Sequence, residues 1–194
     1  MTIVKKKEEE GARDPDARWG VKHQRKVKTK EGKSIKQTEY FYGYKAHVSL
    51  NAKTHMITSL IPSSGEAWDG KYLKLLVEKD LAQELPVEIV GADRGYDDHG
   101  LHYYLEQEKE IHPAPCGIHS GILLKDIRTK KKDKNKEVWF ALMKTPQYQQ
   151  ARKERFKIER KFGEAKQSHG LGRCRYVELS RTVRDCWDLA FKPS

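Results

Sequence analysis

Residues 87–98, Val-Glu-Ile-Val-Gly-Ala-Asp-Arg-Gly-Tyr-Asp-Asp, combine a strand pattern with a glycine turn. The first half of this stretch, Val87–Ala92, is a short apolar run typical of a buried strand, and the run ends at Asp93. A carboxylate placed where an apolar strand gives way to a glycine turn lies at the open carboxyl end of a sheet, where α/β proteins bind ligands and metals. The same residues also suit a plain strand-ending turn, because Asp and Gly favour turns.

Helix and strand patterns flank this strand on both sides, so the sequence predicts an α/β fold. The sequence first predicts a hairpin over 40–50 and 56–61, a helix capped by Asp69 and ended by Pro86, and the strand ending at Asp93. It then predicts a helix starting at Asp97 or Asp98, a short strand at Ile111, a basic surface loop over 116–136 and a helix over 146–168. Residues 1–38 are lysine-rich and poor in apolar side chains, which predicts a basic, mostly irregular N-terminal arm ahead of a folded domain over 39–194.

The charge of the chain favours a polyanionic partner. The formal net charge of the 194 residues is +11, which points most simply to nucleic acid, although solubility alone would also account for it. The charge is uneven: residues 5–36 carry a net +6, residues 37–121 a net −6, and residues 150–184 a net +7. An enzyme that binds a phosphate backbone and coordinates a divalent metal in its active site needs basic outer segments around an acidic centre.

Other functional classes are excluded or disfavoured by composition. No apolar run approaches the roughly 18 residues that a membrane-spanning helix needs, and the N-terminus lacks the apolar core of a signal peptide. We therefore expect a cytoplasmic protein with no membrane partner. The three cysteines are widely spaced, which indicates neither a disulfide framework nor a zinc ribbon.

A second carboxylate lies in the predicted C-terminal helix, in the pattern Arg155-x3-Glu159-x6-Lys166. At about 100° per residue, these three side chains fall on one stripe of the helix, next to an apolar stripe. Glu159 is therefore expected at the border of the packed face. An ordinary ladder of ion pairs would give the same pattern. If this helix packs against the strand that ends at Asp93, however, the two carboxylates would form part of an oxygen-ligand Mg²⁺ site.

These motifs resemble, in order and spacing, those of bacterial insertion-sequence transposases with an RNase H-like DDE catalytic domain. The matching motifs are Tyr42-Gly43-Tyr44-Lys45-Ala46-His47, Asp69 ahead of Leu73, Asp93-Arg94-Gly95-Tyr96, and Arg155-x3-Glu159-x6-Lys166. The resemblance covers most of the chain, from the Asp14-Pro15-Asp16-Ala17-Arg18 stretch to Tyr176. It implies an RNase H-like mixed sheet flanked by helices, with residues 39–194 as the catalytic domain.

The resemblance also assigns roles to individual residues. Asp93 is similar to the second catalytic Asp of the family and Glu159 to its catalytic Glu, which makes both of them metal ligands. Arg155 and Lys166 resemble the accessory basic positions and are expected to contact DNA. The position of a family tyrosine is occupied here by Arg152.

The first catalytic Asp of the family has no counterpart in the sequence. In the family it lies on a first apolar strand upstream of the hairpin, and no such strand precedes Tyr40. We therefore expect a chain that is incomplete at its N-terminal end and lacks the first strand of the sheet.

The function implied by the resemblance is DNA transposition. The family performs Mg²⁺- or Mn²⁺-dependent phosphoryl transfer at transposon ends with two metal ions. With Asp93 and Glu159 alone we expect one weak metal site, retained DNA affinity and impaired catalysis. Two alternatives stay open: a noncatalytic basic nucleic-acid-binding protein, and an unrelated nuclease in which Asp97 or Asp98 converges with a lysine. A homodimer is an option that the sequence leaves open.

Overall fold

The computed structural model describes residues 2–4, 14–28, 34–107, 118–129, 134–168 and 178–181. It contains helices and strands throughout, which confirms the mixed α/β class. The strands are β1 (Thr2–Val4), β2 (Arg18–Lys28), β3 (Ser34–Leu50), β4 (Ile57–Ser64), β5 (Ile89–Ala92) and β6 (His119–Ile122). The helices are α1 (Gly70–Ala82), α2 (His99–Gln107), α3 (Lys136–Lys144), α4 (Pro146–Glu154) and α5 (Phe156–Ser168), with short 3₁₀ helices η1 (Arg94–Tyr96) and η3 (Asp126–Thr129).

The chain divides into two compact units, which we describe separately. Unit 1 comprises Met1–Val48, Leu60–Ala67 and Phe162–Ser194, and unit 2 comprises Ser49–Ser59 and Trp68–Lys161. No helix in the described ranges is both long enough and apolar enough to cross a bilayer.

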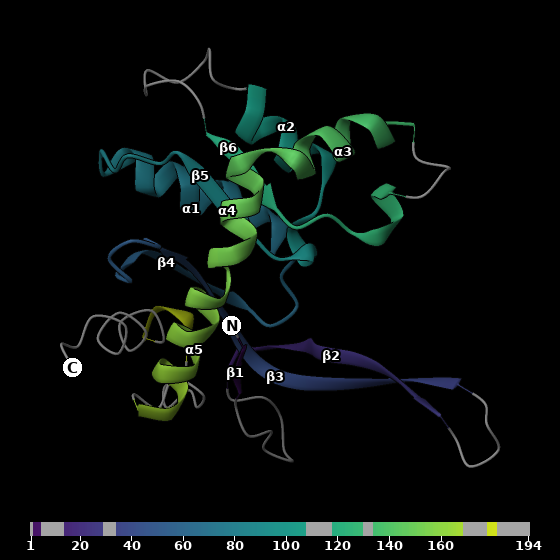
Figure 1. Ribbon diagram of the computed structural model, residues 1–194. Helices are drawn as coiled ribbons and strands as arrows, with labels where there is room; N and C mark the ends of the chain where they lie inside the picture. Colours follow the sequence, from purple (N-terminus) through teal and green to yellow (C-terminus); the bar gives the residue numbers. More distant parts are fainter. Residues whose placement is uncertain are drawn as a thin grey trace. The chain divides into compact units, whose positions relative to one another are not determined.

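The sheet that dominates unit 1 is built around β3. This strand pairs antiparallel with β1 and with β2, and β4 also pairs with β3, which confirms the predicted hairpin. β2 and β3 form a long two-stranded ribbon (Figure 1). Strand structure therefore begins earlier than the sequence predicts, because 18–28 and 34–38 lie in the segment expected to be irregular. Backbone pairing stabilises this ribbon, whereas sequence patterns mainly detect burial.

The core of unit 1 collects around Tyr44, whose side chain is fully buried. Its buried apolar neighbours are Ala17, Ala46, Leu60 and Ala165. The Tyr44 hydroxyl donates to Asp14 Oδ1 at 2.6 Å, and the backbone N–H groups of Asp16 and Glu178 donate to the same oxygen at 3.2 and 3.3 Å. Asp14 is thus a buried structural carboxylate that ties the start of β2 to this core.

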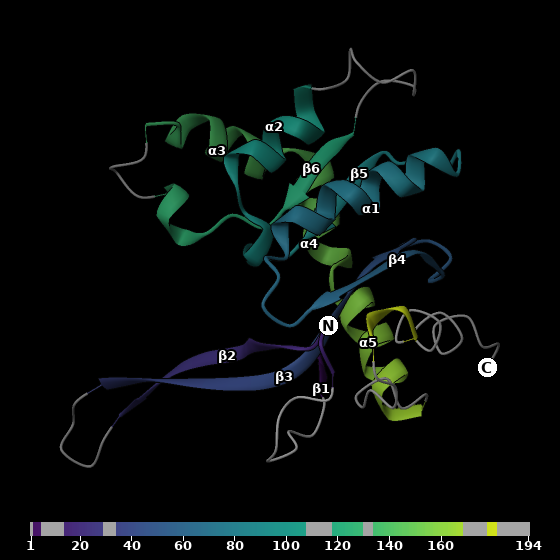
Figure 2. The ribbon, with the colours of Figure 1, turned by 180° about the vertical axis from the view of Figure 1, so that it is seen from behind.

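The second sheet, in unit 2, is a parallel pair of β5 and β6 (Figure 2). β6 falls in the stretch predicted to be a loop, and a strand expected near residue 111 lies outside the described residues. α1 and α2 cover one face of the pair and α4 covers the other, in both ribbon views. In the part of the chain that the structure describes, no strand joins this pair to the sheet around β3.

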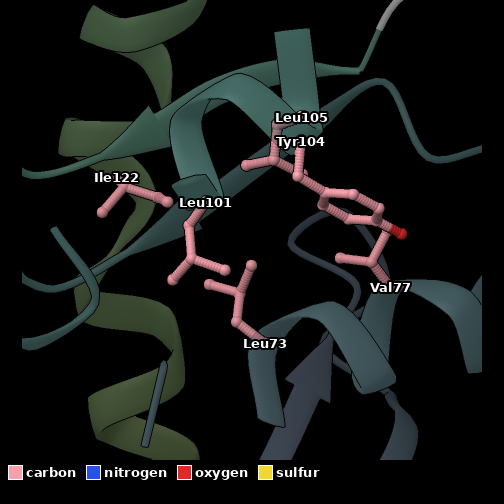
Figure 3. Packing of buried hydrophobic residues seen from close by; sticks show 6 residues of the cluster. All are labelled: Leu73, Val77, Leu101, Tyr104, Leu105 and Ile122. Atoms are coloured by element: carbon pink, nitrogen blue, oxygen red, sulfur yellow. The ribbon is translucent and has the colours of Figure 1, made fainter. Parts of the chain in front are cut away.

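Buried side chains from α1, α2 and β6 form the core on one face of this pair (Figure 3). They are Leu73, Val77, Leu101, Tyr104, Leu105 and Ile122, and Val90 and Ala92 of β5 pack against them. Residues at every second position of β5 therefore face α1 and α2. This packing confirms the helices predicted after Asp69 and after Asp98.

Glycines on the other face of the pair allow α4 to lie close to the sheet. A Cβ atom placed on Gly91 would lie 3.3 Å from Ala151 Cβ, and one placed on Gly121 only 2.2 Å from it. Side chains larger than hydrogen at Gly121 would therefore push α4 away from the strands. The small residues seat α4 directly on the strand that ends at Asp93.

The helix predicted over 146–168 is present but divided. α4 ends at Glu154, α5 begins at Phe156, and Arg155 lies between them with α-helical φ and ψ angles. The Thr145 side chain caps α4 by accepting from the Tyr148 backbone N–H, and Pro146 occupies the first turn. Composition indicated the helical region correctly, but it carried no signal for the break.

Candidate active site

Asp93 follows directly after β5 and begins η1. Its backbone is extended, with φ −79° and ψ 176°, and its Oδ1 accepts a hydrogen bond from the Gly95 N–H at 2.7 Å. A Cβ atom at Gly95 would lie 2.9 Å from this oxygen, so glycine suits the tight turn. The Asp93 side chain is exposed. The predicted carboxylate at the open end of a strand is therefore present and accessible.

A second carboxylate, Asp69, lies in the same neighbourhood. Burial, and then the negative charges of Asp69 and Asp93, raise the pKa of the Tyr96 hydroxyl above its usual value. Asp69 occupies the N-cap position of α1, as expected, but its side chain makes no capping hydrogen bond. Its charge instead contributes to a negative potential around Tyr96, a role that the sequence did not reveal.

Glu159 lies in the first turn of α5 and is exposed. It forms an ion pair and a hydrogen bond with Arg155, so the predicted i, i+4 relation holds. The exposure of Glu159 differs from the expected border position. The pair lies near the surface, where such interactions contribute about 0–1 kcal/mol to stability. Another cation can therefore replace Arg155 as the partner of the Glu159 carboxylate at a small cost in free energy.

The remaining predicted site residues separate between the two units. Asp93, Arg155 and Glu159 belong to unit 2, and Lys166 belongs to unit 1, where it is exposed. Within the described ranges, no three His, Cys, Asp or Glu side chains gather into a group that could hold a metal ion. A shared metal site of Asp93 and Glu159 therefore stays a prediction.

A different carboxylate, Asp97, is buried and fully engaged. It accepts from the Lys125 N–H at 2.7 Å, from Arg128 Nε at 3.2 Å and from His102 Nε2 at 3.2 Å. The Lys125 ammonium group donates to the Asp97 carbonyl oxygen at 3.0 Å. Asp97 does converge with a lysine, as the nuclease alternative required. Its carboxylate, however, is enclosed by its partners and serves as the centre of a structural network.

His102 links this network to β6. Because a carboxylate only accepts, Nε2 carries the proton that is shared with Asp97, and Nδ1 accepts from the Ser120 hydroxyl at 2.7 Å. Burial lowers the pKa of His102, against an opposing effect of Asp97. Ser120 and His102 are 1% and 4% exposed, so this Ser-His-Asp chain has no access for a substrate.

The lowered pKa of His102 predicts a pH effect on stability. Below pH about 6.5 the unfolded chain protonates this histidine while the folded chain resists protonation, so the free energy of unfolding falls as pH falls. Urea unfolding at pH 7.5 and 5.0 should show a smaller pH-dependent loss in His102→Gln than in the wild type. His55→Asn is the matched control, since His55 is exposed and has a positive φ that Asn tolerates. Equal pH dependence in wild type and His102→Gln would contradict the assignment.

The sequence matches a known protein family over most of its length. The family model described as the transposase DDE domain matches residues 7–191, which is most of the chain. The chain belongs to the transposase DDE domain family. The mixed α/β architecture of this DDE domain is consistent with an RNase H-like fold. No curated protein and no solved structure matches the chain significantly.

Proposed function

We propose that this DDE domain binds DNA at transposon ends and that Asp93 and Glu159 together hold a divalent cation, Mg²⁺ or Mn²⁺, for phosphoryl transfer. Membership of the transposase family supports a role in transposition. The observation that carries the proposal is Asp93 itself, an exposed carboxylate at the end of the strand against which α4 packs.

The strand geometry supports convergence of the two carboxylates. Asp93 directly follows β5, two residues beyond Gly91 and with an extended backbone, so continued alternation of side chains would direct it to the same side as Gly91. Gly91 contacts Ala151 of α4 on that face, and α4 leads through Arg155 into the first turn of α5. Glu159 therefore comes five residues after the end of α4, the helix that packs on this side of the strand.

The chemistry of these residues fits a hard divalent cation. Mg²⁺ and Mn²⁺ prefer carboxylate oxygens, and both side chains are exposed. A cation held there would polarise a phosphoryl oxygen and activate the attacking hydroxyl. Asp93 is oriented by the Gly95 N–H, and Arg155 holds Glu159 until a cation or a phosphate replaces the ion pair. With only these two carboxylates, we propose that the chain by itself is impaired in strand transfer.

The ribbon of unit 1 supports a DNA partner. Residues 18–40, which include β2 and the start of β3, carry eight Lys or Arg and two Glu, a net charge of +6. The backbones of Lys26 and Lys36 are directly opposite in the antiparallel register. A two-stranded ribbon fits the major groove of B-DNA, and the phosphates would neutralise its charge. Arg155 and Lys166 would add phosphate contacts, as the family resemblance implies.

The second candidate function is a noncatalytic nucleic-acid-binding protein. The basic ribbon and the ion-paired state of Glu159 favour it, because neither observation requires a metal. The two candidates differ in their response to divalent cations: a pure binding module shows steep salt dependence without a metal requirement.

Anisotropy of a fluorescein-labelled 30-base-pair duplex, measured in EDTA and in Mn²⁺ at constant ionic strength, tests the proposal. The wild type should bind in EDTA and bind several-fold more tightly in Mn²⁺, because the cation joins the carboxylates to a phosphate. Asp93→Asn and Glu159→Gln should bind in EDTA without the Mn²⁺ increment. Binding that is identical in both conditions would favour the noncatalytic module, and a wild type that fails to bind would contradict both candidates.

A further inference from the structure

A cleft of about 460 Å³ opens on unit 2 beside the start of α1, and none of the residues that carry the proposed metal chemistry lines it. Its walls come from the start of α1 and from α2, with the residues just before each helix. The lining residues are Trp68, Gly70, Lys71, Lys74, Asp98, Gly100, Leu101 and Tyr104.

Trp68 supplies a flat aromatic surface at this cleft. A Cβ atom on Gly70 would lie 2.3 Å from Cζ2 of the indole, so the ring rests on the backbone of Gly70. The side chain is nevertheless 59% exposed. An indole supported from one side and open to solvent elsewhere is suited to stack on a nucleic-acid base.

Two cations line the same cleft as this ring. Lys71 and Lys74 are three residues apart on α1, which puts them on the same side of the helix. The Lys74 ammonium group lies 4.4 Å from the centroid of the Tyr104 ring and 3.9 Å from Glu78 Oε1, so a cation–π contact and an exposed ion pair hold it at the cleft wall. Asp69 directly precedes the helix and Asp98 lines the same cleft, so the phosphate position is set by the two lysines and not by the helix N-terminus. The positive charges of Lys71 and Lys74 favour a phosphate beside the aromatic surface.

The cleft is close to the candidate catalytic carboxylate. α1 packs against η1, and η1 begins immediately after Asp93. Asp69, which lies between Trp68 and Gly70 in the chain, acts electrostatically on Tyr96 together with Asp93. A strand held in the cleft would therefore pass near the site proposed for phosphoryl transfer.

We propose that this cleft binds one nucleotide of a single-stranded DNA segment, with the base stacked on Trp68 and the phosphate bound by Lys71 and Lys74. A duplex hides the faces of its bases, so the cleft selects unpaired nucleotides. The choice of DNA as the ligand rests on the proposed function, whereas the stacking geometry does not depend on the metal site.

The test is anisotropy of a fluorescein-labelled twelve-residue oligothymidylate. Trp68→Ala should weaken binding by roughly 5- to 150-fold, the range expected for one lost base stack, while Trp68→Phe should retain most of the affinity. Lys71→Ala and Lys74→Ala should each reduce the slope of log affinity against log salt by about 0.7. Tyr103→Ala is the matched control and should leave binding unchanged, because Tyr103 is an aromatic residue of α2 that is 59% exposed and does not line the cleft.

A second variant keeps the indole but displaces it. Gly70→Ala puts a Cβ atom where the Trp68 ring lies and should reproduce the loss seen in Trp68→Ala. Unchanged oligonucleotide binding in both variants would overturn the proposal. If binding is unchanged and the sedimentation coefficient of Trp68→Ala is altered, the cleft is a protein interface, and the proposal is likewise overturned. Oligothymidylate binding without any Mn²⁺ effect on duplex binding would overturn the metal site and leave the cleft intact.

Discussion

The affinity of this DDE domain for duplex DNA is expected to fall about 10³-fold between 50 and 200 mM salt. The reason is the release of counterions when lysine and arginine side chains neutralise phosphates. The ribbon segment 18–40 alone carries eight such side chains, and about six phosphate contacts suffice for an effect of this size. Anisotropy titrations of one duplex at four salt concentrations measure the slope.

Neutralising part of the ribbon tests whether it makes these contacts. The triple variant Lys26→Gln, Lys28→Gln, Lys36→Gln should reduce the magnitude of the slope by about 2.7, since each lost contact removes about 0.9 on B-DNA. Lys53→Gln, in the exposed turn between β3 and β4, is the control and should leave the slope unchanged. A slope that is the same in the triple variant and the wild type would exclude the ribbon from the DNA interface.

Replacing Asp97 by alanine is expected to lower the free energy of unfolding by about 3–5 kcal/mol. The change leaves Arg128, whose side chain is only 13% exposed, without its buried counter-charge, and it removes the acceptor of the Lys125 N–H. It also removes the hydrogen-bond acceptor of Nε2 of His102, whose ring packs against Trp139. The corresponding fall in Tm is about 6–20 °C for a chain of this length, measurable by circular dichroism.

Asp126→Ala is the matched control for this prediction. Asp126 pairs with Arg94 at 3.0 Å, but its side chain is 78% exposed, so its removal should cost less than about 1 kcal/mol. A loss below about 1 kcal/mol in Asp97→Ala would show that the buried network does not stabilise unit 2.

Elements whose stability depends on local burial could be predicted from sequence. The apolar run before Asp93 formed β5, and the leucine spacing after Asp69 formed α1, because each presents a hydrophobic face to a core. The position of Asp93 at the strand end followed from the same pattern. The i, i+4 relation of Arg155 and Glu159 followed from helix geometry alone.

Elements whose stability depends on distant pairing could not be predicted. β2 is rich in lysine and arginine and is stabilised by antiparallel pairing with β3. No local apolar pattern in β2 predicts this pairing. β6, with the sequence His-Ser-Gly-Ile, becomes a strand through parallel pairing with β5, about 30 residues earlier in the chain. Parallel strands usually show a continuous apolar run, and β6 lacks one because Ile122 is its only large apolar residue.

Side-chain clusters were the least accessible to sequence reasoning. Asp97 meets Lys125 and Arg128 across separations of 28 and 31 residues, so only the fold brings them together. Asp97 and Asp93 are similar in sequence context, yet one is buried among donors and the other is exposed at the strand end. Burial, which the sequence did not distinguish, separates the structural carboxylate from the candidate catalytic one.

Electron paramagnetic resonance of the free Mn²⁺ ion measures whether the purified chain binds a divalent cation at Asp93 and Glu159. We predict one weakly bound Mn²⁺ per chain, with an affinity at least about tenfold lower in Asp93→Asn and in Glu159→Gln and unchanged in Asp126→Ala. Mn²⁺ affinity that is equal in the wild type and in both carboxylate variants would contradict a metal site shared by Asp93 and Glu159.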